Sequence, residues 1–411
     1  MNKNLLFSML ALTAFAFADG DTNSSTLLAG DNLVAGCDTE CKPKPVCKPK
    51  PVCKPKPKPP VCCVREGIAP NVLTSSRPCD DIGLYLFADA LYWHADVTNA
   101  EWAFVNPTGV TSPVSGKNQE LAFKWNWGFR VGIGYEFEHD QWDSDIYYTW
   151  FHNRAASNGS TSSTHFTVPA AGSASSLNTD SSMSPITAAS GTASAKLRFN
   201  VLDWELGRAF YVSNSISLRP HVGIKGAWIK LTENESFTGT GALATYSSSD
   251  TTKSWAVGPS AGINSNWYFG CANTMPSTRG GEVGDRPMFS IFGDVSGALM
   301  YGHFKNRHSE TGLTAAGAAS GGFSASGLNR NLMVPVLTGI MGLQWDICFA
   351  CDSMHLGIRA GYELQYWFRQ NQRFSNFNTA GLGESVAAPR YTRTTGDLAL
   401  QGLTIDVRFD F

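Results

Sequence analysis

Cysteine is the residue type of this chain best suited to covalent chemistry, and seven of the ten cysteines lie near the N-terminus. Cys-Lys-Pro-Lys-Pro-Val occurs twice in succession, from Cys41 and from Cys47, and a similar run follows from Cys53. Alternating proline excludes helix and favours an extended polyproline II conformation. Successive cysteines of the repeat then lie roughly 19 Å apart, whereas a disulfide needs Cα atoms about 6 Å apart. These three cysteines therefore cannot pair with one another while the segment is extended.

Their partners are cysteines of other molecules or the neighbouring Cys37, Cys62, Cys63 and Cys79. Two interpretations remain, a cross-linking arm in an oxidising compartment and a linker with local disulfides. Zinc is disfavoured, because the repeats contain neither Cys-x-x-Cys nor His. Three cysteines lie farther along the chain: Cys271, Cys348 and Cys351. Cys348-Phe-Ala-Cys351 lacks the βαβ context of a redox motif, so we predict a structural or intermolecular disulfide there.

The first 18 residues have the features of a secretory signal peptide. Lys3 precedes an apolar run from Leu5 to Phe17, and Ala16-Phe17-Ala18 forms a small-x-small cleavage site. The apolar run is too short to be a transmembrane helix. We therefore predict a signal peptide over 1–18, a periplasmic Pro/Lys/Cys-rich arm over 19–80 and a separate domain over 81–411. The formal net charge of −2 gives no support for nucleic-acid binding.

From residue 82 onward, apolar and polar residues alternate with a period of two, which predicts β-strands. In the clearest run, Phe123 to Phe137, one face is aromatic or aliphatic and the other is small or charged. A strand this long exceeds the usual five or six residues and fits a position between lipid and a lumen. Similar runs occupy 84–93, 142–151, 196–201, 216–228, 255–268, 288–301, 332–347, 354–368 and 398–411. The alternation changes near Leu202, where we predict a bulge.

The predicted fold is thus all-β, a transmembrane antiparallel barrel of about ten strands (8–12). Connections near 138–141, 210–214, 269–286 and 347–352 are mostly short, whereas those near 95–120, 153–195, 231–252, 304–330 and 369–396 are long and polar. Short periplasmic turns and long extracellular loops alternate in this way in outer-membrane barrels. Both termini and all the cysteines then fall on the periplasmic side. The last strand ends in Phe411, which resembles the signal used by barrel assembly machinery.

With these strands defined, the chain resembles the Legionella-type major outer membrane protein family, also expanded in chlamydia-like bacteria. The resemblance covers roughly residues 80–411. It rests on Ala88-Asp-Ala-Leu-Tyr-Trp93, Trp127-Gly-Phe-Arg-Val-Gly-Ile-Gly-Tyr135, Leu202-Asp-Trp-Glu-Leu-Gly-Arg208 and Leu218-Arg-Pro-His-Val-Gly-Ile-Lys-Gly-Ala-Trp228. It implies a porin-like barrel in the outer membrane. The Cys-Lys-Pro arm departs from the family pattern and looks like an adaptation to an envelope cross-linked by disulfides.

Charged residues on the polar strand faces are the candidate lining of a lumen. They are Lys124, Arg130, Glu136, Arg219, His221, Lys225, Arg359, Glu363, Asp406 and Arg408. One interpretation is a mildly basic constriction that prefers anionic solutes. The other is that the charges pair across strands and plug a narrow barrel. Tryptophans near strand ends predict interfacial girdles: Trp93, Trp142, Trp150, Trp228, Trp255, Trp267, Trp345 and Trp367.

We therefore predict a porin-like barrel for diffusion of small hydrophilic solutes that is also a disulfide-cross-linked structural component of the envelope. The alternative is a non-conducting structural or adhesin barrel. Gly258-Pro-Ser-Ala-Gly262 matches a nucleophile elbow, but it lies inside a predicted strand instead of a strand-to-helix turn. We expect no enzyme activity, cofactor or metal. The expected partners are outer-membrane lipid, barrel assembly machinery and disulfide-linked periplasmic or envelope proteins, with further copies of the chain as candidates.

Overall fold

The computed structural model describes residues 83–106, 117–137, 142–160, 166–169, 188–213, 216–239, 243–269, 288–314, 319–327, 329–349, 354–378 and 389–411. The predicted signal peptide and arm lie outside these residues, and so do Cys37, Cys41, Cys47, Cys53, Cys62, Cys63, Cys79, Cys271 and Cys351. The backbone of Cys348 is described, but its side chain is not. The disulfide predictions therefore stay predictions.

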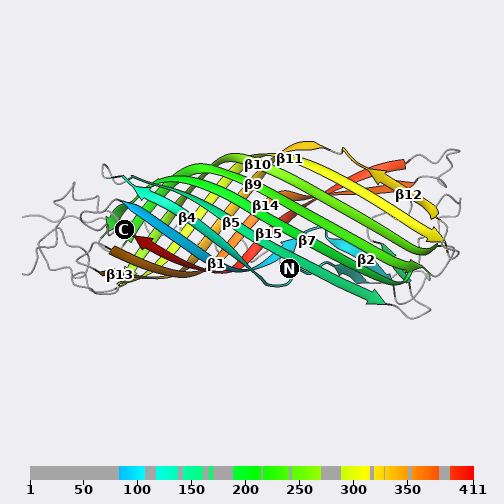
Figure 1. Ribbon diagram of the computed structural model, residues 1–411, viewed down its shortest axis with the longest axis horizontal. Coiled ribbons are helices and arrows are strands. Elements are labelled where there is room, and N and C mark those ends of the chain that lie inside the picture. The colour runs from blue at the N-terminus through cyan, green and yellow to red at the C-terminus, as the bar shows by residue number, and fades with distance from the viewer. Residues whose placement is uncertain are drawn as a thin grey trace, which may run out of the picture. The chain divides into compact units, whose positions relative to one another are not determined.

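Ten long antiparallel strands close into a barrel (Figure 1). In ring order they are β1 (Leu84–Val97), β4 (Asn126–Glu136), β5 (Trp142–Ser160), β7 (Ala188–Arg208), β9 (Ile216–Gly239), β10 (Leu243–Phe269), β11 (Met288–Thr314), β13 (Arg330–Phe349), β14 (Met354–Asn378) and β15 (Pro389–Asp410). The first strand pairs with the last, from Tyr85↔Asp410 to Val97↔Leu398. Because the closed ring has no sheet edge, the backbone N–H and C=O groups of these strands form hydrogen bonds with neighbouring strands even in lipid. The all-β barrel of about ten strands is confirmed.

Five short strands are attached to this ring. They are β2 (Glu101–Asn106), β3 (Lys117–Glu120), β6 (Phe166–Pro169), β8 (Phe210–Ser213) and β12 (Ala319–Ala325). We call the end of the barrel where β1 begins and β15 ends the terminal end, and the other the far end. In Figure 1 the label C marks the terminal end, and β2 and β12 lie towards the far end.

Several strands are longer than the sequence predicted. β9 and β10 pair as far as Thr238↔Thr245, so the long loop predicted over 231–252 is wrong. The same holds for much of 153–195, because β5 and β7 pair as far as Ser160↔Ser190. At the terminal end, by contrast, β10 ends at Phe269 and β11 begins only at Met288. The predicted strict alternation of long and short connections is therefore wrong. The polar residues of these two segments continue hydrogen-bonded strands.

The two faces of the barrel exchange character part-way along the strands. On β7, Leu202 and Trp204 point outward while Asp203 is buried inside. Nearer the far end of the same strand, Arg198 is exposed outside and Phe199 is buried inside. Pairing with β5 and β9 runs unbroken through this point, so the predicted bulge near Leu202 is wrong. The alternation of inward and outward side chains therefore continues through this point, and only the polarity of the residues on each face changes.

Outward aromatic residues mark where this exchange occurs. Trp150, Trp228 and Trp255, here called the aromatic row, lie two residues on the terminal side of the first outward basic residues. On β10, Trp255 is followed twelve residues later by outward Trp267 near the terminal end. At about 3.4 Å per residue and a tilt of about 45°, this interval spans roughly 29 Å, close to the hydrocarbon thickness of a bilayer. We call this part of the barrel the membrane zone and the part beyond the aromatic row the far zone.

Glycines on the inward face of β4 make room for aromatic rings of β1. A Cβ atom on Gly134 would lie 2.0 Å from Tyr85 Cζ, and one on Gly132 would lie 2.3 Å from Phe87 Cζ. Gly134→Val is therefore expected to displace the Tyr85 ring and to lower the free energy of unfolding by about 1–3 kcal/mol. Urea unfolding in detergent, followed by tryptophan fluorescence, measures this change. Gly339→Val is the matched control, because its Cβ would meet only a carbonyl oxygen at 3.9 Å; equal losses for both variants would contradict the packing argument.

Candidate functional site

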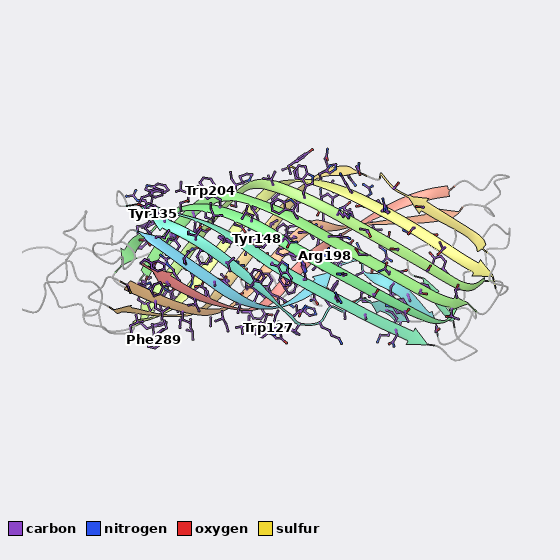
Figure 2. All side chains as sticks on the ribbon, viewed as in Figure 1. Trp127, Tyr135, Tyr148, Arg198, Trp204 and Phe289 are labelled. Carbon is purple, nitrogen blue, oxygen red and sulfur yellow. The ribbon has the colours of Figure 1, made fainter. Side chains whose placement is uncertain are left out.

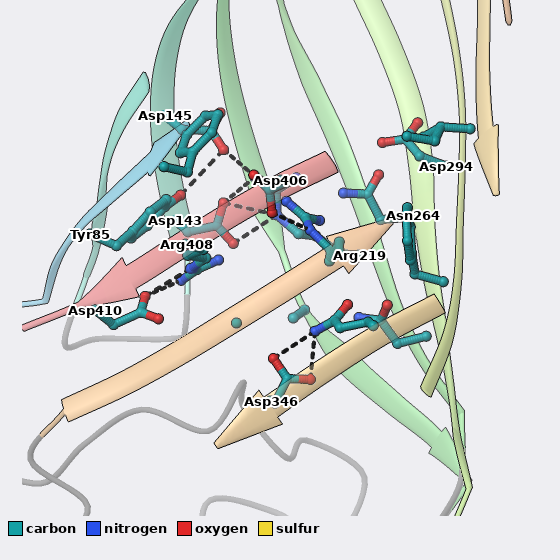
Figure 3. A pocket seen from close by; sticks show the side chains of 18 of the residues that line it. Tyr85, Asp143, Asp145, Arg219, Asn264, Asp294, Asp346, Asp406, Arg408 and Asp410 are labelled. Carbon is teal, nitrogen blue, oxygen red and sulfur yellow. Dashed lines mark hydrogen bonds and ion pairs between the residues drawn. The ribbon is translucent and has the colours of Figure 1, made fainter. Parts of the chain in front are cut away.

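The interior of the membrane zone holds a charged vestibule of about 260 Å³ towards the terminal end. Figure 3 shows the carboxylates of Asp143, Asp145, Asp406 and Asp410 gathered around Arg219 and Arg408. The described lining contains nine carboxylates, four arginines and His355. The predicted mildly basic constriction is therefore wrong for this vestibule, whose lining is acidic. The lining carboxylates that were not predicted from the sequence alternate with lipid-facing residues on β1, β5, β7, β11, β13 and β15.

Arg130 is the centre of one ion cluster within the barrel. Its guanidinium contacts Asp89 of β1 and Glu363 of β14, both at 2.7 Å. Glu363 also accepts hydrogen bonds from Thr404 (2.8 Å) and Gln365 (2.8 Å). Both carboxylates are almost fully buried, and a buried charge is costly unless it is paired. The positive charge of Arg130 therefore compensates their negative charges.

Arg219 of β9 is the centre of a second cluster. Its guanidinium is bonded to Asp143 of β5 and also lies 3.6 Å from Glu205 of β7. Next along β9, Lys225 pairs with Asp203 of β7 at 2.5 Å. The pairs bridge neighbouring or next-neighbouring strands, so carboxylates within the barrel interior balance the charge of both cations.

Nine of the ten predicted lumen residues face the barrel interior. Arg359 pairs with Asp406 at 2.7 Å, Arg408 with Glu136 at 2.9 Å, and His221 lies 3.8 Å from Glu205. Lys124 is the exception and a correction: it is exposed and precedes β4. The alternation predicted from Phe123 breaks there, because Phe123 is buried and bridges to Ala155 while Trp125 is exposed.

On the side of the vestibule nearer the far end, the interior is filled by apolar side chains, here called the apolar layer. They form one buried cluster that includes Leu91, Trp93, Phe151, Phe199, Ile229, Met300, Val334, Val336, Trp367, Leu398 and Leu400. The rings of Phe199 and Trp367 meet edge to face with centroids 5.3 Å apart. Their strands, β7 and β14, are five places apart in the ring of ten and so lie opposite each other. This contact therefore crosses the lumen.

The apolar layer also corrects the predicted girdles. Trp93 and Trp367 are 0% exposed and lie inside the barrel. Their indole N–H groups donate to Thr404 (3.1 Å) and Gln365 (3.2 Å), both of which bond Glu363. Trp142, Trp228, Trp255 and Trp267 are exposed on the outside, and Trp150 and Trp345 are partly exposed there. Inward tryptophans resemble interfacial ones in sequence, because both occur near the ends of apolar runs.

β14 bends over the lumen just beyond this layer. Its register with β15 shifts between Trp367 and Asn371, and Arg369 has a left-handed φ of 57°. From Gln370 to Arg373 every side chain is buried. Gln370 donates to Ser254 of β10 at 2.6 Å, and Asn306 of β11 donates to the Gln372 carbonyl at 2.7 Å. These bonds tie the bend of β14 to β10 and β11.

Comparison with known proteins agrees with this architecture. Residues 76–411 match the family model of the Legionella pneumophila major outer membrane protein precursor. The chain belongs to this family. It is therefore an outer-membrane β-barrel protein, and the resemblance noted from its sequence is confirmed. No protein of curated function gave a significant match.

Two solved structures are distant matches to this member of the major outer membrane protein family. A Pseudomonas aeruginosa FadL homologue is 9% identical, with a TM-score of 0.24, and the match covers 82% of this chain and 91% of that one. The P. putida toluene transporter TodX is 8% identical, with a TM-score of 0.20, and the match covers 80% and 90%. At these scores neither structure bears on the substrate of this family member. Within the described residues, no helix is long and apolar enough to cross a membrane, and no three His, Cys, Asp or Glu residues gather as a metal site would require.

A third interior ion cluster lies in the far zone of this family member, outside the membrane. His308 of β11 contacts Asp250 at 2.7 Å and Glu310 at 2.5 Å. Arg373, on the bend of β14, pairs with Glu235 of β9. Burial opposes protonation of His308, but its two acidic partners outweigh burial and raise its pKa to about 9.

This raised pKa predicts a pH-dependent stability. Protonated His308 stabilises the fold fully below its ordinary pKa of 6.5, and the contribution is lost as the pH rises through about 9. The expected loss is on the order of 2–3 kcal/mol. Urea midpoints in detergent between these pH values measure it. His308→Gln should flatten the profile, whereas His303→Gln, on the outer face of the same strand, should not; a profile that is the same for all three proteins would exclude His308 as the cause.

Proposed function

We propose that this protein is an abundant structural barrel of the outer membrane whose lumen is closed in its resting state. The observation that carries the proposal is the contact of Phe199 with Trp367 across the lumen, within a layer of fully buried apolar side chains. A diffusion pore needs a continuous hydrated path, whereas this interior has apolar side chains packed as in a protein core. The non-conducting alternative from the sequence is thus favoured over the open porin.

The open porin remains the second candidate, and the vestibule is the observation that favours it. A cavity of about 260 Å³ lined by charged groups would admit water and small ions from the terminal end. Movement of the bend of β14 would be needed to connect it with the far end. Because carboxylates outnumber arginines in the lining, such a pore would prefer cations.

Single-channel recording of the refolded full-length protein in a planar bilayer separates the two functions. The closed barrel predicts no steady conductance steps, although heat-modifiable mobility and protection from protease show that the protein has folded and inserted. Steady steps would overturn the proposal. The reversal potential in a salt gradient would then test the cation preference.

The proposal also includes the orientation and the cross-linking predicted from the sequence. The terminal end faces the periplasm, so that Cys41, Cys47 and Cys53 are positioned to form disulfides with envelope proteins. Envelopes treated with an alkylating reagent and run without reductant should show the chain in high-mass species that reductant releases. Serine replacement of these three cysteines should reduce those species. Unchanged species would leave a linker with local disulfides.

A further inference from the structure

A continuous row of basic side chains runs around part of the outer surface, two residues beyond the aromatic row. The directly paired residues are His152↔Arg198 on β5 and β7, Arg198↔Lys230 on β7 and β9, Lys230↔Lys253 on β9 and β10, and Lys253↔Lys305 on β10 and β11. We call these five residues the basic row. Arg198, labelled in Figure 2, lies on the outer face and nearer the far end of the barrel than Tyr148.

The basic row has no acidic partners among the described residues of its own strands. Two positions farther along, Arg154, Lys196 and Arg307 add three more outward cations. The described carboxylates of β5, β7, β9, β10 and β11 occupy alternate positions and face the interior, as Glu233, Glu235 and Glu310 do at this level. The outer surface here therefore carries charge of one sign.

Such an arrangement is unfavourable unless something neutralises it. Like charges placed directly opposite each other on neighbouring strands destabilise a sheet. The electrostatic cost is visible at Lys196, beyond the membrane zone, whose pKa is lowered by Arg198, Arg154 and Lys230. Four strand spacings of about 4.8 Å give the row a length of roughly 19 Å. A ligand that bears several negative charges would match this length.

The surroundings of the basic row indicate an amphiphile. Tryptophan of the aromatic row is typical of the membrane–water interface, so the basic row lies at the depth of lipid headgroups. A surface groove of about 650 Å³ lies at one end of the row, lined by Trp150, Arg154 and Arg198, among others. Towards the terminal end, the same face continues with Leu202, Val257 and Tyr301, which are exposed and apolar. An acyl chain would lie along them.

We propose that the basic row binds the phosphate groups of a multiply phosphorylated membrane lipid in the leaflet at the far end of the barrel. The phosphates neutralise the opposed cations, and the acyl chains cover the apolar face beside them. Free phosphate has no chains to place there, which is why a lipid is the occupant. This inference does not depend on whether the lumen conducts.

Full-length protein in phosphatidylcholine nanodiscs tests the proposal, with lipid A, a disaccharide lipid with two phosphates, as the probe. Wild-type protein should bind lipid A at least about tenfold more tightly than dephosphorylated lipid A, and binding should weaken with salt. The variant R198Q/K230Q/K253Q/K305Q should lose at least about tenfold in lipid A affinity. The control K117Q/R208Q/R330Q/R369Q removes the same charge from described positions outside the row. It should retain the lipid A affinity of the wild-type protein.

Each other outcome would overturn the proposal. Equal lipid A affinity of the two quadruple variants would show that the row is not the site. Equal binding of lipid A and its dephosphorylated form by the wild type would remove the role of phosphate. Displacement of lipid A by inorganic phosphate at a similar concentration would make it a phosphate site instead of a lipid site. Heat-modifiable mobility confirms that each variant is folded before it is measured.

Discussion

Arg130→Met is expected to lower the free energy of unfolding by about 3–5 kcal/mol, the usual cost of removing one partner from a buried ion cluster. Among the described residues, Arg130 is the cation that pairs with Asp89 and Glu363, and both carboxylates are almost fully buried. Methionine fills similar space but leaves two carboxylates to be protonated or hydrated inside the barrel. Urea unfolding in detergent, followed by tryptophan fluorescence, measures the loss.

A compensated variant shows whether charge is the cause. Arg130→Met combined with Asp89→Asn and Glu363→Gln removes the whole cluster's charge and should recover most of the lost stability, since a buried ion pair replaced as a unit is often nearly neutral. Arg208→Met is the surface control and should change stability by about 0.5 kcal/mol or less. A loss of under 1 kcal/mol for Arg130→Met would mean that water in the vestibule screens the cluster.

The fold could be predicted from the sequence because lipid imposes a strict pattern. A strand between lipid and an interior must alternate, and runs such as Phe129 to Phe137 do so without interruption. The direction of each side chain then follows from parity, which is why Arg130, Arg219 and Arg408 are found inside. Beyond the membrane zone the outward residues need not be apolar. Polar strands such as 231–239 therefore have the same composition as loops and cannot be distinguished from them in the sequence.

The contents of the interior could not be predicted in the same way. Arg130 and Glu363 are 233 positions apart in the chain. They meet because β4 and β14 are three places apart in the ring, separated by β1 and β15. The bend of β14 contains no glycine or proline from which it could have been predicted, because the residue with the left-handed φ is Arg369. Trp93 and Trp367 satisfy the same apolar pattern as lipid-facing tryptophans. Closure of the lumen thus depends on register and tertiary packing, which a single sequence does not display.

Trp367→Ala is expected to lower the free energy of unfolding by about 3–5 kcal/mol, because it deletes a fully buried side chain from the apolar layer and leaves a cavity. The matched control is Trp255→Ala, which removes the same side chain from the outer face, where 42% of it is exposed. Detergent or lipid can fill the space left outside, so the control should lose much less, about 1 kcal/mol. Chemical unfolding of both variants in the same detergent measures the difference.

The comparison of these two tryptophans also decides how the lumen should be understood. A large excess cost for Trp367→Ala means that the apolar layer is packed as a protein core is, and a packed core across the lumen leaves no water path. Similar costs for the two variants would mean that water already reaches Trp367. The contact of Trp367 with Phe199 would then be a constriction and not a seal, and the closed structural barrel would give way to a narrow pore even before a conductance was recorded.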